Sequence, residues 1–147
     1  MTDDIVETLL IRVFKGHINN VHRNPQQIAQ DDRAIADYKE SLRLNPNDPA
    51  VYNALAWLQA TCPDERCRDG ENAVANAVNG NELSGGDNWD HIDTLAAAYA
   101  EDCQFDKAVE MQTKAIKLAP ETEKERLRSR LELYKHGKPY REEPKKE

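Results

Sequence analysis

One stretch of this sequence occurs twice, and this repeat restricts the fold more than any other feature. Residues 31–46, DDRAIADYKESLRLNP, align with residues 105–120, FDKAVEMQTKAIKLAP, at an offset of 74 residues. In both copies the small and apolar residues recur at intervals of three and four, as in a helix that buries one stripe, and a proline ends the copy. A helix that occurs twice at a wide spacing indicates an array of similar helical units.

A second repeat lies between these two copies. Residues 51–60, VYNALAWLQA, align with residues 91–100, HIDTLAAAYA, at an offset of 40 residues. Leucine and alanine coincide in this alignment, at Leu55 and Leu95 and at Ala60 and Ala100. The two kinds of repeated helix alternate along the chain, so the sequence predicts consecutive helical hairpins.

This arrangement resembles the tetratricopeptide repeat, whose unit of about 34 residues is a helix–turn–helix. Gln112 stands where the family has an aromatic residue. The other positions of the family pattern match best in residues 89–122, at Ile92, Leu95, Ala96, Tyr99, Ala108 and Pro120. The stretch AWLQATCPDERCRDGENAV is similar to a bacterial subfamily with a long loop in the middle repeat.

The resemblance implies both a fold and a role. The implied fold is all-α: a right-handed α-solenoid of about three helical hairpins with a C-terminal capping helix. The implied role is that of a protein-interaction module, a scaffold or adaptor without chemistry of its own. Two departures from the family pattern are expected to loosen their surroundings, because Gly80 replaces an alanine and Cys103 replaces a turn glycine.

The first thirty residues are the least regular part of the chain. Apolar residues follow helical spacing from about residue 3 to residue 22 and predict an amphipathic helix. The residues Asn24 and Pro25, with the polar run to Gln30, then break the pattern. The amphipathic helix either packs on the helix of residues 31–45 as an irregular first helix or docks elsewhere, on a second copy of the chain for example. We therefore divide the chain into an N-terminal helix and linker (1–30), a repeat array with its capping helix (31–136) and a tail (137–147).

The capping helix is expected over residues 121–136. Its apolar residues Leu127, Leu131 and Tyr134 recur with helical spacing, and its basic residues, Arg130 among them, are expected to form a charged face toward solvent. Gly137 then ends the helix. The tail that follows, KPYREEPKKE, is short, polar and punctuated by proline, which predicts disorder or loose packing.

Composition excludes several classes of partner. The 147 residues include 27 acidic and 20 basic ones, for a net charge of -7, which is the wrong sign for a protein that must neutralise nucleic-acid phosphates. No run approaches the ~18 to 20 apolar residues that a transmembrane helix needs. Two aspartates near the start stand where a secretory signal carries basic residues. We therefore expect a cytoplasmic protein that binds neither nucleic acid nor membranes.

The acidic excess is concentrated in residues 47–102, which contain eleven acidic residues and only two basic ones, Arg66 and Arg68. One interpretation is a solvated acidic surface that keeps the protein soluble. The other is a face that attracts a basic partner and speeds its encounter. Both interpretations remain open at this stage.

Three cysteines, Cys62, Cys67 and Cys103, fall in the predicted turns of neighbouring hairpins and so on one edge of the array. An odd number of cysteines in a cytosolic chain favours free thiols. The alternatives are a disulfide that involves Cys67 and a zinc site, which the Cys-x4-Cys spacing alone does not complete. The chain has no nucleophile elbow, no phosphate-binding glycine loop and no dinucleotide fingerprint. We expect no enzyme activity, no cofactor and no metal.

The resemblance also implies where a partner binds, because the first helix of each hairpin lines the concave face of such an array. The implied binding residues are Asn53, Trp57, Asp90, Asp93 and Ala97. Trp57 is either an exposed anchor for a partner or a packing residue between neighbouring helices. The groove lacks the cations that hold acidic peptides in this family, so a protein or peptide that is basic or neutral is the expected partner. The alternative function is self-association, a homodimer formed through the N-terminal helix.

Overall fold

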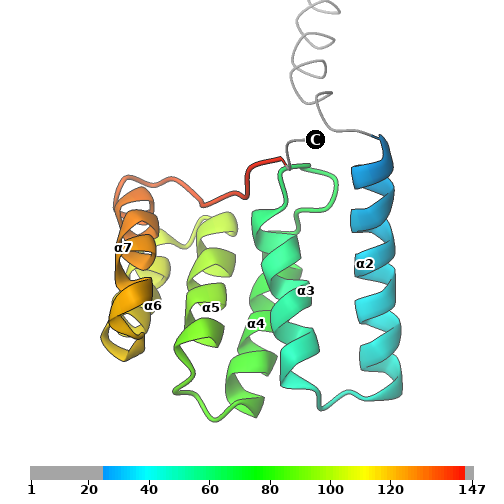
Figure 1. Ribbon diagram of the computed structural model, residues 1–147, viewed down its shortest axis with the longest axis horizontal. Coiled ribbons are helices and arrows are strands. Elements are labelled where there is room, and N and C mark those ends of the chain that lie inside the picture. The colour runs from blue at the N-terminus through cyan, green and yellow to red at the C-terminus, as the bar shows by residue number, and fades with distance from the viewer. Residues whose placement is uncertain (1–24, 145–147) are drawn as a thin grey trace, which may run out of the picture.

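The computed structural model describes residues 25–144, and within that range every regular element is a helix (Figure 1). The prediction of an all-α fold is confirmed for these residues. The helices of the described range are α2 (Pro25–Leu44), α3 (Pro49–Thr61), α4 (Gly70–Leu83), α5 (Trp89–Glu101), α6 (Phe105–Leu118) and α7 (Glu121–Lys135). The amphipathic helix predicted for residues 3–22 lies outside the described residues.

The helices recur in matching pairs. Helices α3 and α5 each have 13 residues, and α4 and α6 each have 14. The connection from α3 to α4 spans residues 62–69, whereas the connection from α5 to α6 is the short turn of residues 102–104. The long loop that the family resemblance implied for the middle repeat is therefore the 62–69 connection, and the helices on either side of it keep the lengths of their counterparts.

Side-chain caps explain where three of the helices begin. Asp48 accepts hydrogen bonds from the backbone N–H groups of Ala50 and Val51 at the start of α3, where proline occupies the first turn. Asp69 and Asn88 cap α4 and α5 in the same way. Acceptors of this kind satisfy N–H groups that have no partner inside the helix.

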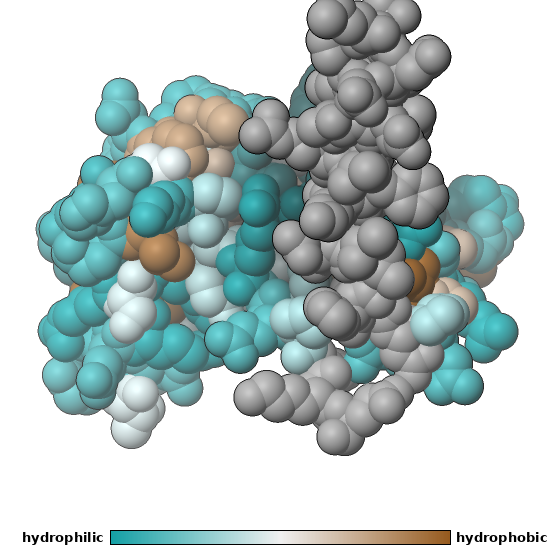
Figure 2. Space-filling model, turned by 90° about the horizontal axis from the view of Figure 1, so that it is seen from above, coloured by the Kyte–Doolittle hydropathy of each residue, from teal (hydrophilic) through white to brown (hydrophobic). Residues whose placement is uncertain are grey.

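Each helix packs on the next one along the chain, and α3 also packs on α5. The core between them consists mainly of alanine, with Leu55, Ile92 and Leu127 among its larger members. Small residues allow close approach: a Cβ atom at Gly80 of α4 would lie 3.2 Å from Cβ of Tyr52 in α3. Helix α4 continues through Gly80 without a break, so the expected loosening does not occur there. Outside the grey atoms, the face in Figure 2 is mainly hydrophilic.

Helix α2 differs from the other helices because none of its residues is fully buried. It packs on α3 with half-buried residues at helical spacing, Ile28, Ile35 and Leu42 among them. It also begins at Pro25, six residues earlier than the boundary drawn from the sequence. Proline fits the first turn of a helix, and the polar residues up to Gln30 continue that helix instead of interrupting it.

The chain after α7 has no regular structure but is packed against the helices, contrary to the expected loose tail. Gly137 ends α7 with a φ of 67°, as expected from the sequence. The following residues run from the end of α7 across α5 to the end of α3 (Figure 1). We call residues 138–144 the C-terminal strap. None of the helices in residues 25–144 has the length and apolar composition that crossing a bilayer requires.

Candidate functional site

Four of the five predicted binding residues line one cavity of about 280 Å³. Its walls come from α3, α5, α7 and the strap, and its lining includes Asn53, Trp57, Asp90 and Asp93. Ala97 is fully buried in the alanine core instead, so its methyl group does not reach this surface. The structure therefore joins residues from two neighbouring hairpins into one recess, as the sequence expectation required, with the exception of Ala97.

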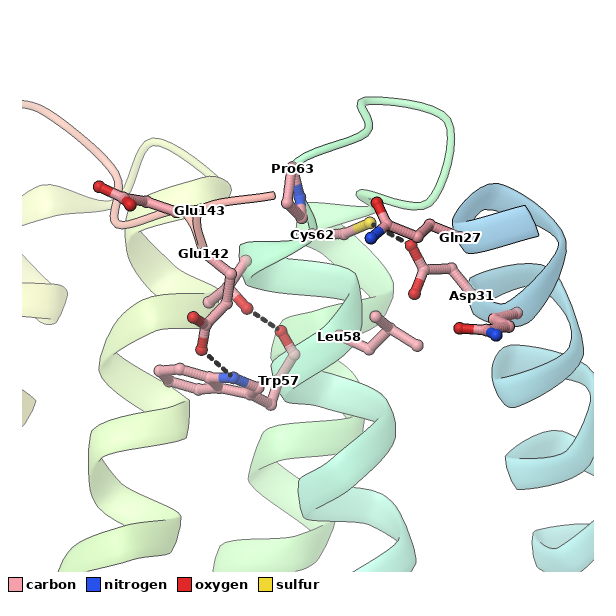
Figure 3. Close-up of a pocket in the computed structure, with 10 residues that line it drawn as sticks. Gln27, Asp31, Trp57, Leu58, Cys62, Pro63, Glu142 and Glu143 are labelled. Atoms are coloured by element: carbon pink, nitrogen blue, oxygen red, sulfur yellow. Dashed lines mark hydrogen bonds between the residues drawn. The ribbon is translucent and has the colours of Figure 1, made fainter. Parts of the chain in front are cut away.

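Trp57 is the centre of the contacts between the helices and the strap. Its indole Nε1 donates a hydrogen bond to Oε1 of Glu142 at 3.1 Å (Figure 3). Its ring lies 5.8 Å from the ring of Tyr140, centroid to centroid, and the guanidinium of Arg130 lies 4.8 Å from its centroid. The same guanidinium is 4.5 Å from the centroid of Tyr140. Trp57 is thus both packed against the core and in contact with a peptide segment from elsewhere in the chain.

Asp93 and Arg130 form a buried ion pair at the base of the cavity. Nη1 of Arg130 donates to Oδ2 of Asp93 at 2.5 Å, and Nε2 of Gln112 donates to the other carboxylate oxygen at 3.0 Å. Each member of the pair is about 3% exposed. Burial raises the pKa of Asp93, although the charge of Arg130 and the amide of Gln112 oppose that rise. Asp93 therefore orients Arg130 and offers little surface to a ligand of its own.

Arg130 corrects the expectation that the basic residues of α7 form one face toward solvent. Its guanidinium lies under the strap, whereas Arg126, one turn earlier on the same helix, has a side chain that is 54% exposed. The acidic partner supplied by α5 explains the difference, because a buried guanidinium requires a counter-charge. The sequence alone does not show that Arg130 points inward, because this depends on how α5 and α7 lie relative to each other.

Two residues that line the cavity also contain buried polar atoms without a hydrogen-bond partner. Asn53 donates to Oδ2 of Asp90 at 3.1 Å, which links α3 to α5 at the rim of the cavity. Among the described residues, Oδ1 of Asn53 and Nε of Arg130 are buried and have no hydrogen-bond partner. A buried polar atom that stays unpaired costs free energy, so these two residues hold their positions at some cost to the fold.

A second cavity of about 360 Å³ lies on the other side of Trp57, between α2, α3 and the strap. Its lining includes Asp31, Leu58, Cys62 and Glu142 (Figure 3). Trp57 and Glu142 line both cavities. The contact between these two side chains therefore separates two recesses on the same side of the helical array.

Two further contacts fix the strap. The backbone N–H of Glu142 donates to the carbonyl of Thr61, the last residue of α3, at 2.8 Å. Glu101 at the end of α5 pairs with Arg141 of the strap at 3.4 Å and with Arg68 of the 62–69 loop at 3.2 Å. The strap is therefore extended and contacts the ends of both α3 and α5. Its side chains are directed to these two helices. The sequence did not indicate these contacts, because Tyr140 and Glu142 lie in a stretch whose composition is typical of loose tails.

The cysteines differ from the expectation of three free thiols. Cys62 and Cys67 form a disulfide across the 62–69 loop, so that expectation is wrong for this pair and the alternative that involved Cys67 holds. The loop brings them together because backbone hydrogen bonds turn residues 64–69 back toward the end of α3. Cys103 is a free, exposed cysteine, as expected, and has a φ of 60°, the left-handed conformation of the turn glycine it replaces.

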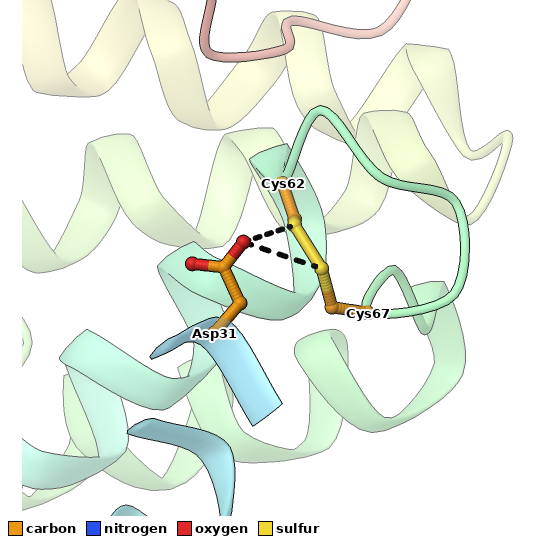
Figure 4. A group of neighbouring side chains, drawn as sticks. All are labelled: Asp31, Cys62 and Cys67. Carbon is orange, nitrogen blue, oxygen red and sulfur yellow. Dashed lines mark hydrogen bonds between the residues drawn. A yellow bond between two sulfur atoms is a disulfide. The ribbon is translucent and has the colours of Figure 1, made fainter. Parts of the chain in front are cut away.

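Asp31 of α2 lies beside the disulfide, with Oδ2 at 3.6 Å from the sulfur of Cys62 and 4.0 Å from that of Cys67 (Figure 4). Among the described residues these three side chains form the group whose spacing suits a metal ion. Thiolates, not disulfide sulfurs, are the ligands that zinc requires. In the oxidised form the group is therefore an unsuitable metal site.

Comparison with known proteins leaves the chain without a relative that could guide the assignment. It matches no protein-family model, no curated protein and no solved structure. Its function must therefore be argued from the geometry of the recess around Trp57.

Proposed function

We propose that this chain is a non-catalytic protein-interaction module that binds an extended segment of a partner protein in the recess around Trp57. In this proposal α3 with α4 and α5 with α6 are tetratricopeptide-like hairpins, α2 is the second helix of a first unit, and α7 caps a right-handed solenoid. The equal helix lengths and the contact between α3 and α5 support this assignment.

Repeated burial is a further support for the repeat assignment. Leu55 and Leu95, which coincide in the sequence alignment, are both buried, and so are Ala60 and Ala100. Equivalent residues of two hairpins therefore have equivalent places in the core, as stacked repeats require.

One observation carries the proposed binding role: an extended peptide segment, the C-terminal strap, lies against Trp57 and forms one wall of the recess. Its contacts comprise a backbone hydrogen bond to Thr61, a side-chain hydrogen bond from Trp57 and an aromatic contact through Tyr140. These are the kinds of contact by which helical grooves and sheet edges hold peptide ligands. A surface that holds one extended segment in this way has the donors, acceptors and aromatic faces to hold another.

Selection from a random peptide library tests this function. The target is the full chain with the strap weakened by Tyr140→Ala and Glu142→Gln, and the counter-target carries Trp57→Ala in addition. We expect enriched peptides that bind the first protein at least tenfold more tightly than the second, since Trp57 lies at the centre of the recess. A selection that yields no peptide, or only peptides indifferent to Trp57, would refute the proposed function.

A further inference from the structure

We infer that the C-terminal strap is an internal ligand, and that the partner is an extended peptide with an aromatic residue followed two positions later by a carboxylate. This inference rests on the proposed function and names the chemistry of the partner. In the strap, Tyr140 is the aromatic residue and Glu142 supplies the carboxylate. The partner competes with the strap for the same groups of the helices.

The aromatic requirement comes from two faces that the helices present. The Arg130 guanidinium contacts the rings of both Trp57 and Tyr140, at 4.8 and 4.5 Å from their centroids, and the two centroids are 5.8 Å apart, so the three groups form a triangle of contacts. The carboxylate of Asp93 holds that guanidinium in place through the buried ion pair. A planar cation fixed beside an indole ring is a platform for a third planar group, which gains a cation–π contact and an aromatic contact there. An aliphatic side chain in the place of Tyr140 would lose both the contact with the guanidinium and the contact with the indole ring.

The preference for a carboxylate comes from the indole N–H of Trp57, which needs an acceptor, because a charged acceptor makes a stronger hydrogen bond than a neutral one. That group is a donor only, and Glu142 accepts its hydrogen bond at 3.1 Å. The backbone of the same residue donates to the carbonyl of Thr61, which fixes the register of the segment relative to α3. Aromatic and acidic side chains two residues apart therefore reach Trp57 together when the segment is extended, because side chains two positions apart project to the same side.

The strap is held mainly at the surface. Its residues 141–144 are exposed, and Tyr140 is half-buried at the edge of the core cluster that contains Tyr134. By contrast, Leu127 of α7 is fully buried and α7 packs on α6, so we expect α7 to stay attached when the strap leaves. Trp57 and Glu142 line both cavities, so displacement of Glu142 enlarges the open surface on each side of Trp57.

The 280 Å³ cavity is balanced in charge and can therefore accept one carboxylate, although the sequence favoured a basic or neutral partner. Apart from Glu142, the charged residues that line the 280 Å³ cavity are Asp90, Asp93, Arg126 and Arg130, two of each sign. The acidic excess of residues 47–102 therefore does not collect in this cavity. A single carboxylate that replaces Glu142 restores the charge present in the structure.

A tethered ligand competes at a high local concentration. Short flexible connections give effective concentrations on the order of millimolar, so a free peptide with micromolar affinity for the open groove binds the intact chain far more weakly. We therefore expect that weakening the strap exposes the site and increases the affinity for a free peptide by at least tenfold.

The test uses the labelled peptide GKPYREEP, which reproduces residues 137–144, and measures its binding by fluorescence anisotropy. The proteins are the full wild-type chain, Glu142→Gln, the double variant Tyr140→Ala with Glu142→Gln, and this double variant with Trp57→Ala. The control peptide GKPARQEP lacks the aromatic residue and the carboxylate. We expect at least tenfold tighter binding to the double variant than to the wild type, an intermediate affinity for Glu142→Gln, and loss of binding with Trp57→Ala or with the control peptide.

Three results would overturn the inference. The first is a double variant that keeps its helical circular dichroism but binds the two peptides equally. The second is a double variant that loses its helical signal, because the strap would then belong to the fold. The third is a library selection whose peptides depend on Trp57 but lack an aromatic residue and a carboxylate at this spacing. That third result would leave the proposed function in place, whereas an empty selection would remove it.

Discussion

Replacement of Arg130 by methionine tests whether the buried ion pair organises the recess. Methionine keeps much of the packing of the arginine side chain but leaves the carboxylate of Asp93, about 3% exposed, without its cation. Removal of one partner from a buried pair costs about 3–5 kcal/mol. The variant also loses the contacts of the guanidinium with Trp57 and Tyr140. Since small domains have a free energy of unfolding of about 5–15 kcal/mol, this loss is a large fraction of the total.

The pH dependence of this variant identifies the cause. Burial already raises the pKa of Asp93, and Arg130 is the main group that opposes the rise, so its removal raises that pKa further. A carboxyl group with a higher pKa in the folded than in the unfolded state stabilises the fold below the unfolded pKa. That contribution is lost as the pH rises through the folded pKa. The destabilisation by Arg130→Met is therefore greatest at neutral pH and smaller in acid.

Urea unfolding, followed by circular dichroism at about pH 7.5 and about pH 5, measures both effects. The matched control is Arg126→Met, the same change one turn earlier on α7, where the side chain is 54% exposed and pairs with Glu123. We expect that control to change the free energy of unfolding by no more than about 0.5 kcal/mol. An Arg130→Met variant as stable as the control at pH 7.5, or a loss that is equal at both pH values, would refute the role given to this pair.

Three further predictions concern the turns on the edge that carries the disulfide. Titration with a thiol-reactive dye should find one thiol per native chain, that of Cys103, and three thiols after reduction of the Cys62–Cys67 bond. Three thiols without a reductant would contradict the disulfide. Gly70→Ala places a Cβ 2.9 Å from the backbone nitrogen of Asp102, so we expect thermal unfolding to show a loss of about 1–3 kcal/mol, and no loss would contradict this close approach. Cys103→Gly removes the steric strain of a side chain on a left-handed backbone, whose φ is 60° at this residue. This change should raise the free energy of unfolding by about 0.5 kcal/mol. A decrease would show that the thiol contributes more to stability than the relief of backbone strain.

The helices could be predicted from the sequence because two kinds of helix each occur twice in it. Buried alanine and leucine positions such as Ala60 and Ala100 recur at helical spacing, and the same apolar pattern must serve the same packing in each copy. Local cues were weaker at the start of α2, where polar residues continue a helix that Pro25 begins. At this point one stripe of α2 packs on α3, and the helix continues through polar residues that the sequence pattern indicated as its boundary.

The recess was predicted in part, for a physical reason. Trp57, Asp90 and Asp93 belong to helices whose relative placement follows from the repeat, so their convergence could be expected. Tyr140 and Glu142 could not, because nothing in a short polar stretch specifies which surface it contacts. The disulfide depends likewise on the folded course of the 62–69 loop, since a spacing of five residues does not determine whether two sulfurs meet.

The proposed competition requires the C-terminal strap to lie against Trp57 in the native chain, and a two-dimensional NOE spectrum of the wild-type chain measures this contact directly. With ring centroids 5.8 Å apart, the ring protons of Tyr140 and the indole protons of Trp57 should give cross-peaks whose intensity does not change on dilution. Absence of these cross-peaks, with Tyr140 shifts equal to those of the free GKPYREEP peptide, would contradict the account.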